Sequence, residues 1–97
     1  MANKRFEIGK LVSTAGVHAA MEEQPEFSRF VNDSLMRYFA GDWGDTCEEE
    51  AKQNDWSADN DERILAVYDY PGNEDLTIWI ITEWDRSTTT ILFPSEY

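Results

Sequence analysis

The sequence predicts an α+β domain in which two or three N-terminal helices pack on a three- or four-stranded antiparallel C-terminal sheet. Two patterns support this prediction. Apolar residues recur at three- and four-residue steps in the N-terminal half, and from Arg63 onward their period changes to two. The 97 residues, 41% of them hydrophobic, suffice for one modest core. We therefore expect a single domain over residues 1–97.

The N-terminal segment predicts a short strand followed by a helix. Apolar and polar residues alternate imperfectly from Phe6 to Val12, which favours a strand. Ser13 or Thr14 can then cap a helix over residues 15–23. Pro25 ends that helix and suits the first position of the next one.

The second helix has the clearest pattern in the chain. Its apolar residues lie three or four apart and so form one stripe. Gly41 follows the last of them, where a helix end often needs a left-handed residue. The stripe consists of Phe27, Phe30, Val31, Leu35, Tyr38 and Phe39.

A third helix is predicted over residues 46–56, after the connector Asp42–Asp45. Asp45 and Glu48 have the spacing of a capping box at its start. Its apolar face is thin and is limited to Cys47, Ala51 and Trp56. A helix held by so few contacts is expected to lie on the surface and to present its charges.

The C-terminal third predicts three strands joined by turns. Residues 63–70 alternate with a period of two, and residues 71–75 have the composition of a turn. Residues 76–84 are almost continuously apolar, as in a central strand that is covered on both faces. After a second turn at residues 85–87, the β-branched residues of 88–93 favour a third strand.

The charge of the chain is strongly negative and unevenly distributed. The formal net charge is −12, and residues 1–41 are balanced with five acidic and five basic residues. Residues 42–62 hold nine acidic residues against one lysine, a net charge of −8, and residues 63–97 carry −4. Such a surface repels DNA, RNA and anionic membranes and attracts basic proteins. We therefore expect a basic protein partner, with no direct nucleic-acid or membrane binding.

The sequence also predicts a cytoplasmic protein. Cys47 is the only cysteine, which excludes an intramolecular disulfide and suits a reducing compartment. The N-terminal residues do not lead into a signal peptide. The longest apolar run, Ile78–Ile81, is too short to cross a bilayer.

The acidic block at residues 42–62 is the candidate functional feature. It is either a solvated face that keeps the protein soluble or an imitation of a phosphate backbone. Duplex DNA carries one charge per about 1.7 Å of axis, and a helix rises about 1.5 Å per residue, so a helix dense in acidic residues approaches that charge density. Trp43 and Trp56 flank the block as candidate aromatic anchors. The predicted partner-binding residues are Asp42, Trp43, Asp45, Glu48, Glu49, Asp55, Trp56, Asp59, Asp61 and Glu62.

Catalytic and metal-binding patterns are weak, and we predict no enzyme, no cofactor and no metal site. His18 is the only histidine and has no triad pattern around it. Cys47 is more simply read as a small core residue than as a nucleophile. Glu83 and Asp85 could form an acid–base pair, although the nearby Arg86 favours a structural ion pair. The connector after the second helix lacks the ligand spacing of a calcium loop.

Two segments carry a resemblance to a known family. The motif GDWGD at residues 41–45 and the segment ITEWDRSTTTILFPSEY at residues 81–97 resemble a family of roughly hundred-residue uncharacterised bacterial proteins encoded on plasmids, phages and integrated elements. The likeness extends over most of the chain. Trp84 replaces a residue that is usually small in the family, and residues 55–62 are more acidic than is usual there.

The resemblance implies a protein encoded by a mobile element and acting in the host cytoplasm. Small acidic proteins of such elements are often inhibitors of host defence, including anti-CRISPR and anti-restriction proteins. The leading expectation is thus an inhibitor whose acidic surface occupies a basic nucleic-acid-binding channel. The alternative is a small accessory or protein-interaction domain of the element with no inhibitory role.

Overall fold

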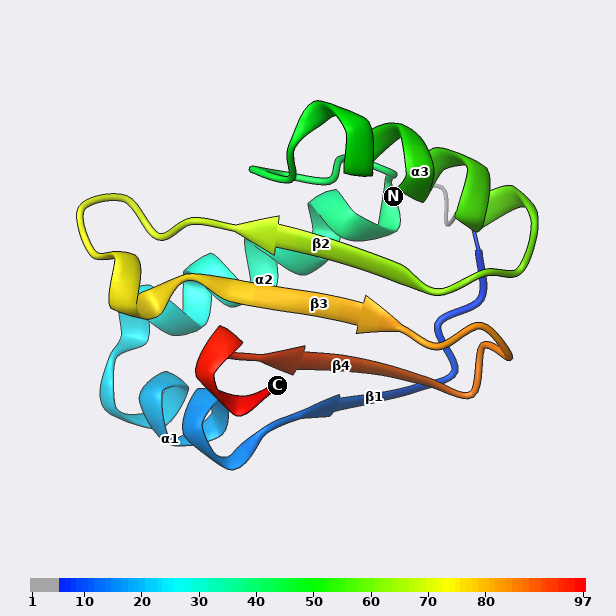
Figure 1. Cartoon of the computed structure of the whole chain (residues 1–97). Coiled ribbons are helices and arrows are strands. Elements are labelled where there is room, and N and C mark those ends of the chain that lie inside the picture. The colour runs from blue at the N-terminus through cyan, green and yellow to red at the C-terminus, as the bar shows by residue number, and fades with distance from the viewer. Residues whose placement is uncertain (1–5) are drawn as a thin grey trace.

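The computed structural model describes residues 6–97 and has the predicted α+β class (Figure 1). Lys4 and Arg5, which enter the charge balance above, lie outside the described residues. Three helices pack on a four-stranded sheet with the strand order β1-β4-β3-β2. Within residues 6–97, none of the helices combines the length and the apolar character needed to cross a membrane. The elements are β1 (Lys10–Ser13), α1 (Ala15–Glu23), α2 (Pro25–Phe39), α3 (Glu48–Asp59), β2 (Ile64–Tyr68), β3 (Ile78–Thr82), β4 (Thr88–Leu92) and the 3₁₀ turns η1 (Glu74–Leu76) and η2 (Pro94–Glu96).

The prediction of a purely antiparallel sheet is wrong for one pair of strands. β2 with β3 and β3 with β4 are antiparallel, but β1 pairs in parallel with β4. The first strand joins the edge beyond the last one, and the connection from β1 to β2 runs through all three helices. The parallel pairing of β1 with β4 is possible because these helices, together with β2 and β3, lie between the two strands in the chain.

The first strand also begins later than predicted. The backbone of Gly9 has a φ of +62°, and a Cβ atom at this position would lie 2.3 Å from the carbonyl oxygen of Arg86. The chain therefore needs glycine at this close approach and enters the sheet only after it. Phe6, which was expected in the strand, is buried instead against the rings of Tyr38 and Trp43.

One face of the sheet packs on α1 and α2, as the apolar stripe of α2 predicted. A chain of hydroxyl groups is buried in this interface near the β3–β4 turn. Tyr38 Oη lies 2.6 Å from Thr82 Oγ1, which lies 2.7 Å from Thr89 Oγ1, and Thr89 donates to the carbonyl of Ile8 at 2.8 Å. Burial raises the pKa of the Tyr38 phenol. The buried polar groups are thus paired with one another rather than left unsatisfied.

Polar side chains hold α3 against the outer edge of β2. Asn54 Nδ2 donates to the carbonyl of Leu65 at 2.9 Å, and its Oδ1 accepts from the amide of the same residue at 3.4 Å. The amide of Val67 donates to Thr46 Oγ1 at 2.9 Å, and its carbonyl accepts from the amide of Asp45 at 2.7 Å. Side chains and main chain of another segment thus pair the edge groups that a further strand would otherwise use.

This edge explains why the predicted capping box is absent. Asp45 accepts a hydrogen bond from the amide of Asp69 at 2.8 Å instead of capping the helix. Helix α3 begins at Glu48, after an N-cap residue, Cys47, that makes no side-chain cap, and it ends at Asp59, three residues beyond the predicted end.

The C-terminal turn η2 ties the end of the chain to the start of α1. The Glu96 carboxylate accepts hydrogen bonds from the hydroxyl of Thr14 and from the amides of Gly16 and Phe93. Desolvation by burial acts to raise the pKa of Glu96, but these hydrogen bonds outweigh it and hold the pKa below its ordinary value.

Removing the side chain of Asn54 should destabilise the protein, because both main-chain groups of Leu65 lose their partner at a site that is almost fully buried. We expect Asn54→Ala to lower the free energy of unfolding by about 2–3 kcal/mol, measured by urea denaturation. The control, Lys52→Ala, breaks only an exposed ion pair with Glu48 and should change it by less than about 0.5 kcal/mol. Equal stability of the two variants would contradict this account of the β2 edge.

Protonation of Glu96 should weaken the C-terminal tie. Because the pKa of this carboxyl is lowered by folding, its contribution is present above the unfolded-state pKa and is lost as the pH falls through the lower folded-state pKa. Glu96→Gln should therefore lower the melting temperature at neutral pH, and the difference from the wild type should shrink in acid. Thermal melts across the pH range test this, with the exposed Glu23→Gln as a control; a difference independent of pH would contradict it.

Candidate functional site

Exposed carboxylates lie along the whole length of α3, and we call them the acidic row. Ala51, Asn54, Ser57 and Ala58 face inward, fully or partly buried. Five acidic residues lie along the 12 residues of the helix, and its one lysine, Lys52, is 3.6 Å from the Glu48 carboxylate. The exposed acidic residues of α3 are Glu48, Glu49, Glu50, Asp55 and Asp59.

The average density of these charges along the helix axis is nearer to that of one nucleic-acid strand than to that of a duplex, although three of the five carboxylates lie in the first turn. Twelve helical residues span about 18 Å, so the five carboxylates average about one per 3.6 Å of axis. One DNA strand carries a phosphate about every 3.4 Å, and the duplex one per about 1.7 Å. The helix therefore has about half the charge density that the sequence led us to expect, a value close to that of a single strand.

Two further acidic residues extend the row into the loop that joins α3 to β2. Asp61 and Glu62 are exposed, and the backbone of Asp61 has a positive φ of 53°. Asp and Asn are among the few residues that tolerate this left-handed conformation. The loop thus turns sharply and presents two carboxylates directly after the end of the helix.

A buried arginine holds this loop in place. The side chain of Arg86 is 10% exposed. Its Nη2 donates to the carbonyl of Ser57 at 2.8 Å, and its Nη1 donates to those of Glu62 at 2.8 Å and Glu83 at 3.1 Å. The guanidinium therefore joins the end of α3, the loop after it and the β3–β4 turn.

The expected pairing of Arg86 with Glu83 and Asp85 is wrong. Its nearest carboxylate is that of Asp61, at 3.9 Å from Nε, whereas the Glu83 carboxylate lies 3.8 Å from Arg63. Asp85 accepts from the amide of Ser87 within its own turn, and hydrogen bonding to the side chain and then the main chain of Ser87 lowers the pKa of Asp85.

Two exposed tryptophans lie next to the points that Arg86 joins. Trp56 directly precedes Ser57 in α3 and is 52% exposed; Trp84 lies two residues before Arg86 and is 64% exposed. Their neighbours Ser57 and Glu83 both accept hydrogen bonds from Arg86, so this side chain joins the two backbone segments that carry the tryptophans. Trp84 was not among the predicted binding residues.

The other predicted anchor, Trp43, is placed in the core. It is 5% exposed, contacts Phe6 and Tyr38, and donates from Nε1 to the Asp55 carboxylate at 2.9 Å. This ring therefore cannot meet a partner directly, and its role is to fix the connector beneath α3.

The two predicted connector carboxylates also hold the structure together. Asp42 forms an ion pair with Arg37 at 2.9 Å and accepts from the amide of Gly44. The hydrogen bond from Arg37 holds the pKa of Asp42 below its ordinary value. The Asp45 carboxylate accepts a hydrogen bond from the amide of Asp69, directly after β2. Seven of the ten predicted residues are thus exposed on α3 and the loop after it, and one of them, Asp55, also holds the Trp43 indole; the seven are Glu48, Glu49, Asp55, Trp56, Asp59, Asp61 and Glu62.

The residues weighed as catalytic lie on separate elements. His18 is exposed on α1 beside Glu22, at 2.6 Å, and Cys47 is exposed before α3. Cys47 is therefore not the core residue that the sequence favoured. Among residues 6–97, no group of three His, Cys, Asp or Glu side chains is arranged to hold a metal ion.

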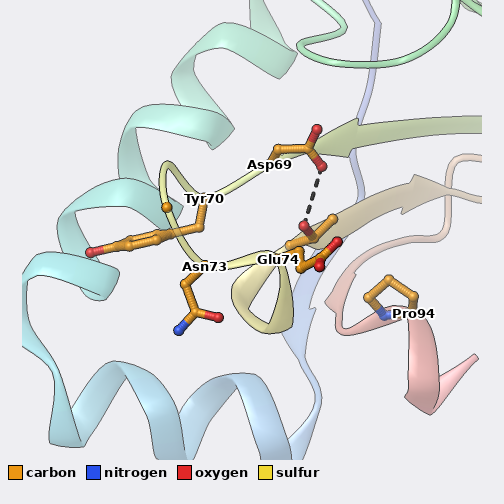
Figure 2. A pocket seen from close by; sticks show the side chains of 7 residues that line it. Asp69, Tyr70, Asn73, Glu74 and Pro94 are labelled. Atoms are coloured by element: carbon orange, nitrogen blue, oxygen red, sulfur yellow. Dashed lines mark hydrogen bonds between the residues drawn. The ribbon is translucent and has the colours of Figure 1, made fainter.

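A shallow polar pocket of about 590 Å³ lies beyond the C-terminal end of β2 (Figure 2). Asp69, Tyr70, Asn73, Glu74 and Pro94 line it, and the Asp69 carboxylate accepts from the hydroxyl of Thr77 at 3.2 Å. The acidic loop lies before the other end of the same strand. The pocket is therefore separate from the acidic row.

Comparison of the chain with models of known protein families, with curated proteins and with solved structures finds no match.

Replacing Arg86 by lysine should loosen the acidic loop, because one ammonium cannot reproduce the fork that reaches three separate carbonyls. We expect Arg86→Lys to cost about 2–3 kcal/mol of unfolding free energy and to speed amide hydrogen exchange in residues 59–63. Arg29→Lys, at an exposed arginine of α2, is the matched control and should leave both unchanged. If the amides of the loop exchange as slowly in Arg86→Lys as in the wild type, Arg86 does not hold the loop in place.

Proposed function

We propose that this chain is an inhibitor that binds a basic protein through the outer side of α3 and the loop after it. The observation that carries the proposal is the set of exposed carboxylates on α3 and the loop after it, together with the exposed Trp56 and Trp84. The row takes the place of a phosphate backbone in a channel lined by Lys and Arg.

The density of the charges and the exposed tryptophans near them support a decoy that imitates a single nucleic-acid strand. The carboxylates of α3 have about the average density of phosphates along one strand, so they offer counter-charges to the basic side chains of a channel. An exposed indole face attracts Arg and Lys through cation–π contacts, and partly desolvated aromatic residues are common binding hot spots. The strong net charge also speeds encounter with a basic partner and makes it sensitive to salt.

The narrower form of the proposal concerns the partner. We assign it to the nucleic-acid-binding effectors of bacterial defence systems, which makes the chain an anti-CRISPR or anti-restriction protein of a mobile element. Support for this form comes from the resemblance of residues 41–45 and 81–97 to proteins of plasmids and phages. The chain would act in the host cytoplasm, where such effectors meet invading DNA.

Neutralising the loop end of the row should abolish inhibition and leave the fold intact. The test variant is Asp59→Asn, Asp61→Asn and Glu62→Gln, in which Asn retains the left-handed conformation of residue 61. Loss of three contacts of about 1 kcal/mol each should weaken binding roughly 100-fold. The matched control, Glu22→Gln, Glu23→Gln and Glu26→Gln, removes the same charge from exposed sites on α1 and α2.

The measurement has two stages. Affinity capture from a bacterial lysate at about 0.05 M and about 0.2 M salt, a range over which contacts to phosphates weaken strongly, identifies the partner. Competition against labelled DNA on the purified partner then gives the inhibition constant of each variant. Equal inhibition by the wild type and the loop variant would refute the decoy.

A second candidate function rests on a different surface. An apolar groove of about 340 Å³ lies between α3 and the sheet and is floored by Leu65, Val67 and Trp79. Tyr97, 67% exposed, packs on Trp79 beside it. An accessory domain that captures a partner through this groove would bind almost equally at both salt concentrations, whereas the decoy would lose affinity steeply.

A further inference from the structure

The two edges of the sheet differ in how their main-chain groups are used. The edge at β2 is paired with Asn54, Thr46 and Asp45. At the other edge, β1 bonds to β4 through alternate residues: the amide of Lys10 donates to Ser87 and that of Thr14 to Ile91, each at 3.0 Å. The parallel register therefore turns the amides and carbonyls of Leu11 and Ser13 outward.

This outer edge lies open over the described part of the chain. In Figure 1, no helix or strand formed by residues 6–97 runs alongside the outer edge of β1. Leu11 is 44% exposed. It borders an apolar groove of about 200 Å³ between the strand and the helices, lined also by Ser13, Met21, Leu35 and Ile91. An unpaired edge beside an apolar groove is suited to the addition of a strand.

We infer that β1 pairs antiparallel with β1 of a second copy of this chain, about a two-fold axis at Val12. In this register Leu11 lies opposite Ser13 of the second copy, and the two exchange both of their main-chain hydrogen bonds. The symmetry repeats the exchange, so four hydrogen bonds join the copies. The two sheets become one continuous eight-stranded sheet with an isologous contact.

The side chains on the helix side fit this register. Each exposed leucine faces a serine, which is small enough to leave the groove beside it accessible. Leu11 of one copy can therefore enter the groove formed by Met21 and Leu35 of the other. Burial of both leucines stabilises the dimer further, by roughly 25 cal/mol for each Å² of apolar surface that is removed from water.

On the opposite side of the sheet, the same register brings unlike charges together. Lys10 lies opposite Thr14 of the second copy, in a pair without main-chain hydrogen bonds, where side chains approach most closely. The hydroxyl of Thr14 donates to the carboxylate of Glu96. Each Lys10 thus faces the Glu96 carboxylate of the other copy, and symmetry makes two such ion pairs.

The distribution of charge favours a second copy over a basic partner at this edge. The acidic row lies on α3 beyond β2, at the opposite edge of the sheet from β1. The two acidic rows of a pair are therefore held at its outer ends, where their mutual repulsion is weakest and screened by salt. A second copy also supplies both requirements of the site, a leucine opposite Ser13 and a cation opposite Glu96.

Sedimentation velocity of the full chain over a range of concentrations tests the pairing, at about 0.15 M ionic strength, where the Debye length is about 8 Å. The wild type should sediment increasingly as a dimer as its concentration rises. Lys10→Glu turns two attractive pairs into repulsive ones and should raise the dimer dissociation constant roughly 10- to 100-fold. Lys52→Glu makes the same charge change on α3 and should leave that constant close to the wild-type value.

Leu11→Pro gives a second test, because it removes one outward amide and one apolar side chain per copy without touching the bonds from β1 to β4. It should leave the chain monomeric. A wild type that stays monomeric at every concentration would overturn the inference, as would a dimer that neither substitution at β1 weakens. The triple variant of residues 59, 61 and 62 should dimerise like the wild type. A chain that does not dimerise and a chain that does not inhibit can therefore be told apart.

Discussion

The placement of α3 depends on hydrogen bonds to the edge of β2 rather than on hydrophobic packing. The helix buries little apolar surface, with Ala58 as its only buried apolar residue. Asn54 pairs with both main-chain groups of Leu65, and Thr46 with the amide of Val67. A helix fixed in this way can leave most of its circumference polar, which is what allows a continuous acidic row to be exposed on a rigid element.

Arg86 completes this arrangement at the end of the helix. Carbonyl groups at a helix C-terminus carry partial negative charge and favour a cation, and here the cation comes from the β3–β4 turn. The same guanidinium fixes the loop that carries Asp61 and Glu62, so the row of carboxylates continues in a defined direction. Because the loop is already ordered before binding, less conformational entropy is lost when a partner binds.

The sequence predicted the parts of the fold that depend on local periodicity. The apolar stripe of α2 and the alternating strands are confirmed, because burial of one face leaves its mark within a few residues. The parallel pairing of β1 and the partners of Asn54 depend on residues far apart in the chain, which no periodicity records. The candidate site divides in the same way: the count of acidic residues located the row, but whether Trp43 or Trp84 is exposed depends on tertiary packing.

The two sheet edges differ in whether their main-chain groups are paired within the chain. The edge at β2 is occupied by the acidic helix, and its main-chain groups are paired within the chain, so a second strand can add only at β1. Pairing there keeps the two acidic rows at opposite ends of the continuous sheet, and each row remains accessible. Two rows on one assembly would let it engage two basic channels, or two segments of a long one, with the gain in avidity that linked sites provide. In that case dimer formation at one edge would strengthen inhibition through the other.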